Sequence, residues 1–132
     1  MLDDFGSISV RAYTASGALP VADATVRISG AEEANRDVIH SLITDRDGIT
    51  PTVILPAPLK EFSETPNPRE APYAIYDIEV SKDGYFTKKI DSVPIFSGVY
   101  SLQPVSMIPD GQNVYDIPKN NLNTTIPQSN LN

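Results

Sequence analysis

The spacing of proline is the feature that most constrains how this chain folds. Twelve of its 132 residues are proline, nearly twice the usual share of about 5%. Proline lacks a backbone donor and blocks helix interiors and central strands, so regular elements must be short. Between the prolines, polar residues alternate with β-branched and aromatic ones, which is the period of a half-buried strand. The expected strands cover residues 7–14, 23–29, 37–44, 49–55, 73–81, 85–93 and 99–108.

The alternation also predicts which side chains face a core. In residues 7–14, for example, Ile8 and Val10 alternate with serine and arginine. Strands of this length with turn signals between them predict an all-β fold, a β-sandwich of seven antiparallel strands. A single helical turn is expected at residues 31–35. The side chains expected to face inward are Ile8, Val10, Val26, Ile28, Val53, Ile78 and Val80.

The length and the distribution of periodic residues predict one folded domain. Residues 1–109 hold all the expected strands and form the β-sandwich domain. Residues 110–132 are rich in asparagine and show no periodicity, so we expect a polar C-terminal tail or linker. Such a segment buries too little apolar surface to offset its ordering entropy, which makes it dispensable for folding.

Charge and cysteine content exclude several classes of partner. The formal net charge is −7 and the pI is near 4.5, so the surface repels nucleic acid and anionic membrane. The chain has no cysteine, which removes disulfides and thiolate chemistry. Apolar runs are too short for membrane insertion. Residues 1–5 lack the basic and apolar regions of a signal peptide, so we expect none in this chain.

No catalytic, metal-binding or cofactor-binding residue is expected from motifs. His40 is the only imidazole, and its neighbour Ser41 must point to the opposite face of a strand. Asp45, Asp47 and Gly48 match part of a calcium loop, but Ile54 stands where an EF-hand needs glutamate. A tight turn is therefore expected there, with a weak site completed by distant carboxylates as the alternative.

The proline-rich segment 56–72 is the candidate binding surface. It carries five prolines in seventeen residues, which predicts either a stiff crossover between strands or a loop that presents side chains to a partner. Phe62 is the natural anchor of such a contact, or else a lid folded over the end of the sandwich. The candidate contact residues are Lys60, Glu61, Phe62, Glu64 and Arg69.

Three motifs in a fixed order add a family resemblance. Residues 19–26 (LPVADATV), 44–48 (TDRDG) and 76–85 (YDIEVSKDGY) resemble the opening strand, the hairpin and the strand-turn-strand of carboxypeptidase regulatory-like domains. The trio spans roughly residues 6–108. The resemblance implies a seven-stranded antiparallel Greek-key β-sandwich of the prealbumin-like (transthyretin-like) type, usually a non-catalytic accessory module.

A narrower resemblance lies in residues 72–76 (PYAIY) and 93–105 (VPIFSGVYSLQPV). They are similar to the N-terminal sandwich of clostridial spore cortex-lytic proteins, which precedes peptidoglycan-binding or hydrolytic domains. This implies a binding, spacing or structural module in a bacterial envelope, spore or secreted assembly, in contact with protein or cell-wall glycan (peptidoglycan). The alternatives are a structural component of a phage tail or injection apparatus, and a hydrolase with two catalytic carboxylates, which need no local motif.

Overall fold

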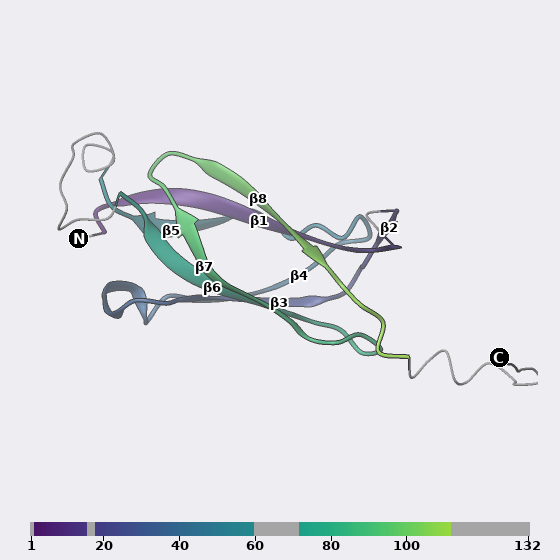
Figure 1. Ribbon diagram of the computed structural model, residues 1–132. Helices are drawn as coiled ribbons and strands as arrows, with labels where there is room; N and C mark the ends of the chain where they lie inside the picture. Colours follow the sequence, from purple (N-terminus) through teal and green to yellow (C-terminus); the bar gives the residue numbers. More distant parts are fainter. Residues whose placement is uncertain (1, 16–17, 60–71, 112–132) are drawn as a thin grey trace, which may run out of the picture.

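The computed structural model describes residues 2–15, 18–59 and 72–111. They form two sheets packed face to face, each of four strands (Figure 1). The first sheet contains β1 (Asp4–Thr14), β2 (Leu19–Pro20), β5 (Val53–Ala57) and β8 (Tyr100–Ser106). The second contains β3 (Thr25–Gly30), β4 (Ile39–Ile43), β6 (Ala74–Ser81) and β7 (Lys88–Ile95), in the order β4-β3-β6-β7. One 3-10 turn, η2 (Glu33–Asn35), joins β3 to β4, and the described residues contain no α-helix. The predicted all-β sandwich is confirmed.

Two details of the sheets differ from the prediction. The eighth strand is β2, which pairs only with Tyr13 and Thr14 at the end of β1. The pairing of β1 with β8 is parallel, with Ser7 opposite Tyr100 and Tyr13 opposite Ser106, so the expected antiparallel arrangement is wrong for this pair. A hairpin fixes antiparallel direction only for strands that are neighbours in sequence. β8 instead reaches the first sheet from β7, which belongs to the second.

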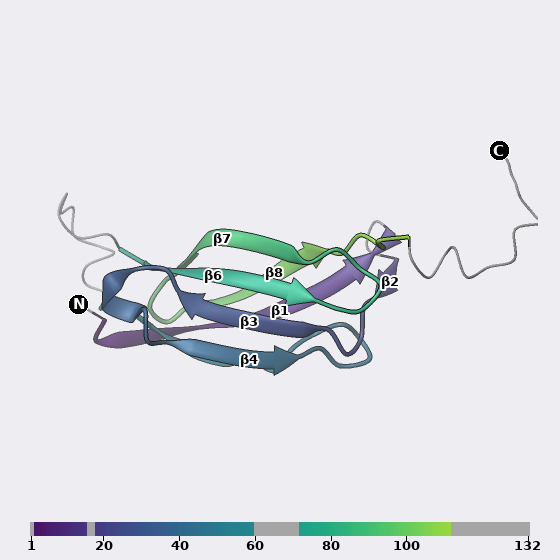
Figure 2. The same cartoon turned by 90° about the horizontal axis from the view of Figure 1, so that it is seen from below.

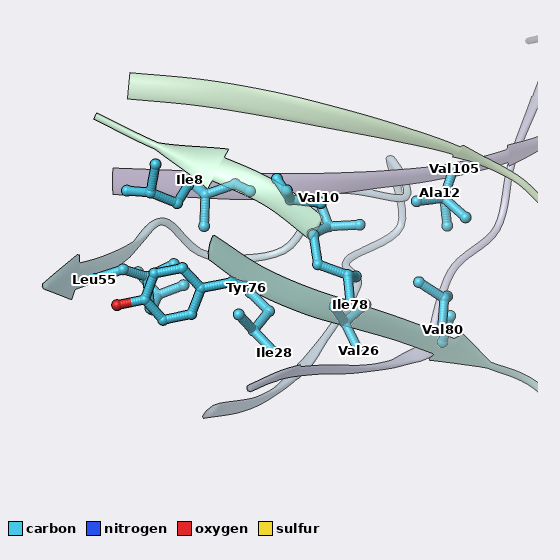
Figure 3. Packing of buried hydrophobic residues seen from close by; sticks show 14 of the residues in the cluster. Ile8, Val10, Ala12, Val26, Ile28, Leu55, Tyr76, Ile78, Val80 and Val105 are labelled. Atoms are coloured by element: carbon cyan, nitrogen blue, oxygen red, sulfur yellow. The ribbon is translucent and has the colours of Figure 1, made fainter. Parts of the chain in front are cut away.

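The core lies between the two sheets, where the alternation placed it (Figure 3). All seven side chains predicted to face inward are buried, with at most 6% of their surface exposed. Tyr76 is the largest fully buried side chain, and its hydroxyl donates a 2.6 Å hydrogen bond to the carbonyl of Pro56. That bond joins the two sheets through their interior and satisfies the one polar atom that the ring brings into the core.

The turn at residues 45–48 is built by its own side chains. Asp45 Oδ1 accepts the backbone N–H groups of Asp47 at 2.8 Å and Ile49 at 3.0 Å. Gly48 has a φ of +79°, and a Cβ there would collide with the carbonyl oxygen of Ala12. Glycine is therefore required both for the backbone conformation and for the close approach of β1.

The β6–β7 hairpin contains a bulge and also contacts the segment that follows β8. The register shifts between Tyr76 and Ile78, and Asp77 Oδ1 accepts the N–H of Ser92 at 3.0 Å, where Ser92 has a φ of +61°. Beyond β8, Asp110 N–H donates to the carbonyl of Gly84 at 3.0 Å, so the chain stays attached to the domain up to this residue. Residues 112–132 lie outside the described ranges, and the division into a domain and a tail stays a prediction.

Candidate functional site

The binding residues predicted in the proline-rich loop cannot be placed. Lys60, Glu61, Phe62, Glu64 and Arg69 lie outside the described residues. Their role as a contact surface stays a prediction. Phe62→Ala separates its two readings, because loss of a buried lid costs about 3–5 kcal/mol, whereas an exposed contact residue costs below about 0.5 kcal/mol.

The residues that carry the family resemblance have structural roles. The Thr44 hydroxyl donates to the carbonyl of Val21 at 2.7 Å and accepts the N–H of Ala24 at 2.9 Å. Ala24 is completely buried and belongs to the hydrophobic core. The carboxylate of Asp45 accepts hydrogen bonds within the turn. The described residues contain no cluster of three potential metal ligands.

His40 and Ser41 lie on opposite faces of β4, as the alternation predicted. His40 is in register with the buried Ile28 and is itself half-buried. Ser41 is exposed on the outer face of the sheet. The adjacent pair therefore does not form a nucleophile with its base.

The sequence did not predict the hydrogen-bond network that surrounds η2. The amide of Asn35, 2% exposed, accepts the N–H of Glu32 at 2.9 Å and donates to the carbonyl of Ile75 at 3.0 Å. Glu32 Oε1 accepts the N–H of Ile75 at 3.1 Å. The network fixes η2 against β6, and burial raises the pKa of the nearby Tyr76 hydroxyl above its ordinary value.

A second perturbed group lies at the start of β1. The Ser97 hydroxyl donates a 2.5 Å hydrogen bond to Asp4 Oδ2, and the N–H of Phe5 donates to Oδ1. Because both bonds favour the charged form, they lower the pKa of this exposed carboxyl. The contact ties β1 to the loop before β8.

A cleft lies at the end of the sandwich, beside the β6–β7 hairpin. Its volume is about 440 Å³. Three aspartates line it, Asp23, Asp83 and Asp110, together with one cation, Lys82, several hydroxyl groups and the ring of Tyr85. Its chemistry suits a ligand rich in hydroxyl or cationic groups.

The outer face of the second sheet is charged across β3, β6 and β7. Arg27 of β3, Glu79 of β6 and Lys89 of β7 stand opposite one another across the three strands. Asp77 and Asp91 lie beside them around a shallow hollow of about 190 Å³. Opposite charges at paired positions support the sheet, and they make this face well solvated.

The outer face of the first sheet is apolar instead. The register places Ile54 of β5 and Tyr100 of β8 on either side of Ser7, and Leu102 beside Ser9. Phe5 lies next in line on β1, opposite Pro56. We call this set the apolar face; its members are Phe5, Ile54, Pro56, Tyr100, Leu102 and Pro104.

The apolar face is large enough to matter for binding. Its four large side chains are strongly exposed: Phe5 54%, Ile54 63%, Tyr100 55% and Leu102 48%. At roughly 200 Å² for a large side chain, these fractions amount to roughly 400 Å² of apolar surface. The largest patch on a typical monomer is about 300–600 Å² and often functional.

Within the described ranges, no helix is long and apolar enough to cross a membrane.

Comparison with known proteins supports the fold and assigns no family. No protein-family model and no curated protein matches the chain. Catechol 1,2-dioxygenase from Acinetobacter sp. ADP1 superimposes with a TM-score of 0.51 at 14% identity, over 97% of this chain and 58% of its own. A DUF3823 family protein from Parabacteroides merdae gives 0.48 at 8%, over 80% and 47%. A type II cohesin-X-dockerin complex from Acetivibrio cellulolyticus gives 0.42 at 17%, over 77% and 56%.

The chain spans about half the length of these solved structures. At such low identity, the likeness to the dioxygenase supports the β-sandwich fold alone.

Proposed function

We propose that this protein is a non-catalytic β-sandwich module that binds another protein through the apolar face. The observation that carries the proposal is the exposure of Phe5, Ile54, Tyr100 and Leu102 on one side of a single sheet. A flat sheet face normally carries polar residues when it faces water. The largest apolar patch of a monomer is often functional, which favours an interaction site on this sheet.

The charge of the molecule favours a partner other than a second copy. The net charge is −7, whereas Arg11 is the single charged residue among the outward-facing positions of β1, β5 and β8, beside the apolar face. Two copies meeting there would bring like charges together and repel at long range. A protein with an apolar centre and a basic rim would be attracted and would bury the same surface.

The family resemblance supports a setting for this contact. It favours an accessory module in a bacterial envelope, spore or secreted assembly, where the sandwich spaces or holds a neighbouring component. Peptidoglycan is the other candidate in that setting, since exposed aromatic rings such as Tyr100 can also stack on sugars.

The test compares two exposed aromatic residues. Tyr100→Ser removes an aromatic ring from the apolar face, and Phe86→Ser removes one that is 59% exposed but lies outside that face. Both variants should keep stability within about 0.5 kcal/mol of the wild type. We expect partners captured by the wild type, identified by mass spectrometry, to be lost with Tyr100→Ser and kept with Phe86→Ser. Equal capture by all three proteins would refute the proposal. Sedimentation with purified peptidoglycan that depends on Tyr100 would show that the partner of the apolar face is a glycan and not a protein.

The alternative function, a hydrolase with two catalytic carboxylates, would use a different site from the apolar face. Asp23, Asp83 and Asp110 line the same cleft, which is where paired carboxylates could act. Release of soluble fragments from peptidoglycan by the wild type, lost in Asp83→Asn, would favour catalysis over binding.

A further inference from the structure

The four edges of the two sheets differ in whether they can accept another strand. In the first sheet, β5 contains Pro56 and β8 contains Pro104; in the second sheet, β7 contains Pro94. Proline lacks the N–H that a pairing strand needs, and it is a common device for blocking an edge. β4 contains neither proline nor a charged residue, and reads Ile-His-Ser-Leu-Ile. It is therefore the one edge among the described strands without such protection.

The backbone groups of β4 that face away from the sheet can be assigned from its neighbours. The carbonyl of Val38 accepts the N–H of Gly30, and the N–H of Thr44 donates to the carbonyl of Ala24. Even-numbered residues of this segment thus direct their backbone groups toward β3. By the alternation of a strand, the N–H and C=O groups of Ile39, Ser41 and Ile43 point outward. In the described part of the chain β4 is the outermost strand of its sheet, beyond β3 (Figure 2).

The side chains along this edge are also incompletely covered. Ile39 is 53% exposed and Ile43 is 61% exposed on the outer face, with Ser41 between them. On the inner face, Val38 and Leu42 pack against the core but stay half-buried. A strand added beside β4 would cover apolar groups on both faces while pairing the outward backbone groups.

We propose that β4 is a docking edge for an extended segment of another protein, which adds a fifth strand to the second sheet. The segment has β-branched or other apolar residues at alternating positions and basic residues at its ends. This mode of recognition takes affinity from main-chain hydrogen bonds and specificity from alternate side chains. It is independent of the proposed function, because it uses the other sheet.

Charge decides between such a segment and a second copy. β4 itself is uncharged, but Asp37, Asp45 and Asp47 flank its ends and outnumber Arg36 and Arg46. The whole molecule carries −7, so two copies would repel as their β4 edges approached. A segment with lysine or arginine around an apolar centre would be attracted.

Amide hydrogen exchange tests the docking edge residue by residue. The probe is a synthetic peptide of alternating valine and threonine with lysine pairs at both ends. We expect its addition to slow exchange at Ile39, Ser41 and Ile43, whereas His40 and Leu42 are protected before and after. Protection that appears on β5, β7 or β8 instead would overturn the proposal, and so would a concentration-dependent dimer that buries β4 without peptide.

A pair of variants at one position supplies the control. Ser41→Pro removes an N–H that points away from β3, so the ladder with β3 keeps its bonds, while Ser41→Thr keeps the N–H. We expect Ser41→Pro to weaken peptide binding by up to about tenfold and Ser41→Thr to leave it unchanged, since the loss of one hydrogen bond is of that order. Thermal melting checks that both variants fold. N-methylation of the peptide along its pairing edge removes the complementary bonds, which peptide N–H groups donate to the outward carbonyls of β4; full affinity after N-methylation would refute strand addition.

Loss of edge binding with intact capture through the apolar face would leave the proposed function standing. In the reverse result, Tyr100→Ser has no effect on the capture of any partner while the peptide still protects β4. That result would refute the proposed function and support the docking edge.

Discussion

Replacement of Thr44 by valine removes one hydroxyl from the interior without changing the shape of the side chain. In the native structure that hydroxyl donates to the carbonyl of Val21 and accepts the N–H of Ala24. Thr44 itself is 2% exposed. Thr44→Val therefore leaves a buried carbonyl and a buried N–H without these partners.

The cost follows from those two groups. Each buried polar group left without a partner costs about 1–3 kcal/mol, and the added methyl group returns up to about 0.8 kcal/mol. We expect Thr44→Val to lower the free energy of unfolding by about 2–4 kcal/mol. Thr44→Ser keeps the hydroxyl and loses one methyl group, which costs about 1 kcal/mol. At about 4 °C per kcal/mol for a domain of this size, the valine variant should melt roughly 10–15 °C lower than the wild type.

Urea unfolding followed by far-UV circular dichroism measures both variants, with tyrosine fluorescence as a second probe because the chain has no tryptophan. The slope of the free energy against urea should stay constant if only the native state is affected. Valine and serine variants of equal stability would refute the structural role assigned to Thr44. A role for residues 44–48 would then have to be sought in ligand binding.

Three further predictions concern the core, the turn and the tail. Burial raises the pKa of Tyr76 above its ordinary value of 10.0, so the tyrosine ionises first in the unfolded chain and the free energy of unfolding falls as the pH rises above about 10. Tyr76→Phe should cost about 1 kcal/mol at neutral pH. The same variant should lose less stability at alkaline pH, as measured by urea unfolding. Gly48→Ala, at a φ of +79° and against Ala12, should destabilise by more than about 1 kcal/mol in the same assay. A chain that ends at Asp110 keeps all of β8 and should melt within a few degrees of the full chain, whereas a large drop would show that the tail packs on the domain.

The core could be predicted because period-two alternation has one physical cause. Ile8, Val10, Ile78 and Val80 alternate with polar neighbours, and only one face of their strands is dry. The turn at Asp45 was equally accessible, since aspartate and glycine supply the hydrogen bonds and the positive φ that such a turn needs. The parallel pairing of β8 was not, because alternation carries no information about strand direction.

The candidate surfaces could not be predicted, because in these strands apolar residues of the alternating pattern face solvent. In β8, Tyr100 and Leu102 face solvent while Ser101 and Gln103 face the same side as Ile8 and Val10. In β4, Ile39 and Ile43 are likewise the outward residues. A sequence pattern assigns apolar residues to the core, so an apolar residue kept outside for binding is misassigned. Such conflicts between local pattern and fold are expected at functional sites.

The central claim is that the first sheet binds a protein through its apolar face. Amide and methyl chemical-shift mapping of the labelled domain with a purified captured partner tests it most directly. The account predicts shifts that cluster on β1, β5 and β8 at Phe5, Ile54, Tyr100 and Leu102, with the charged face around Arg27 and Glu79 unchanged. Shifts confined to that charged face or to the cleft at Asp23 and Asp83 would contradict it.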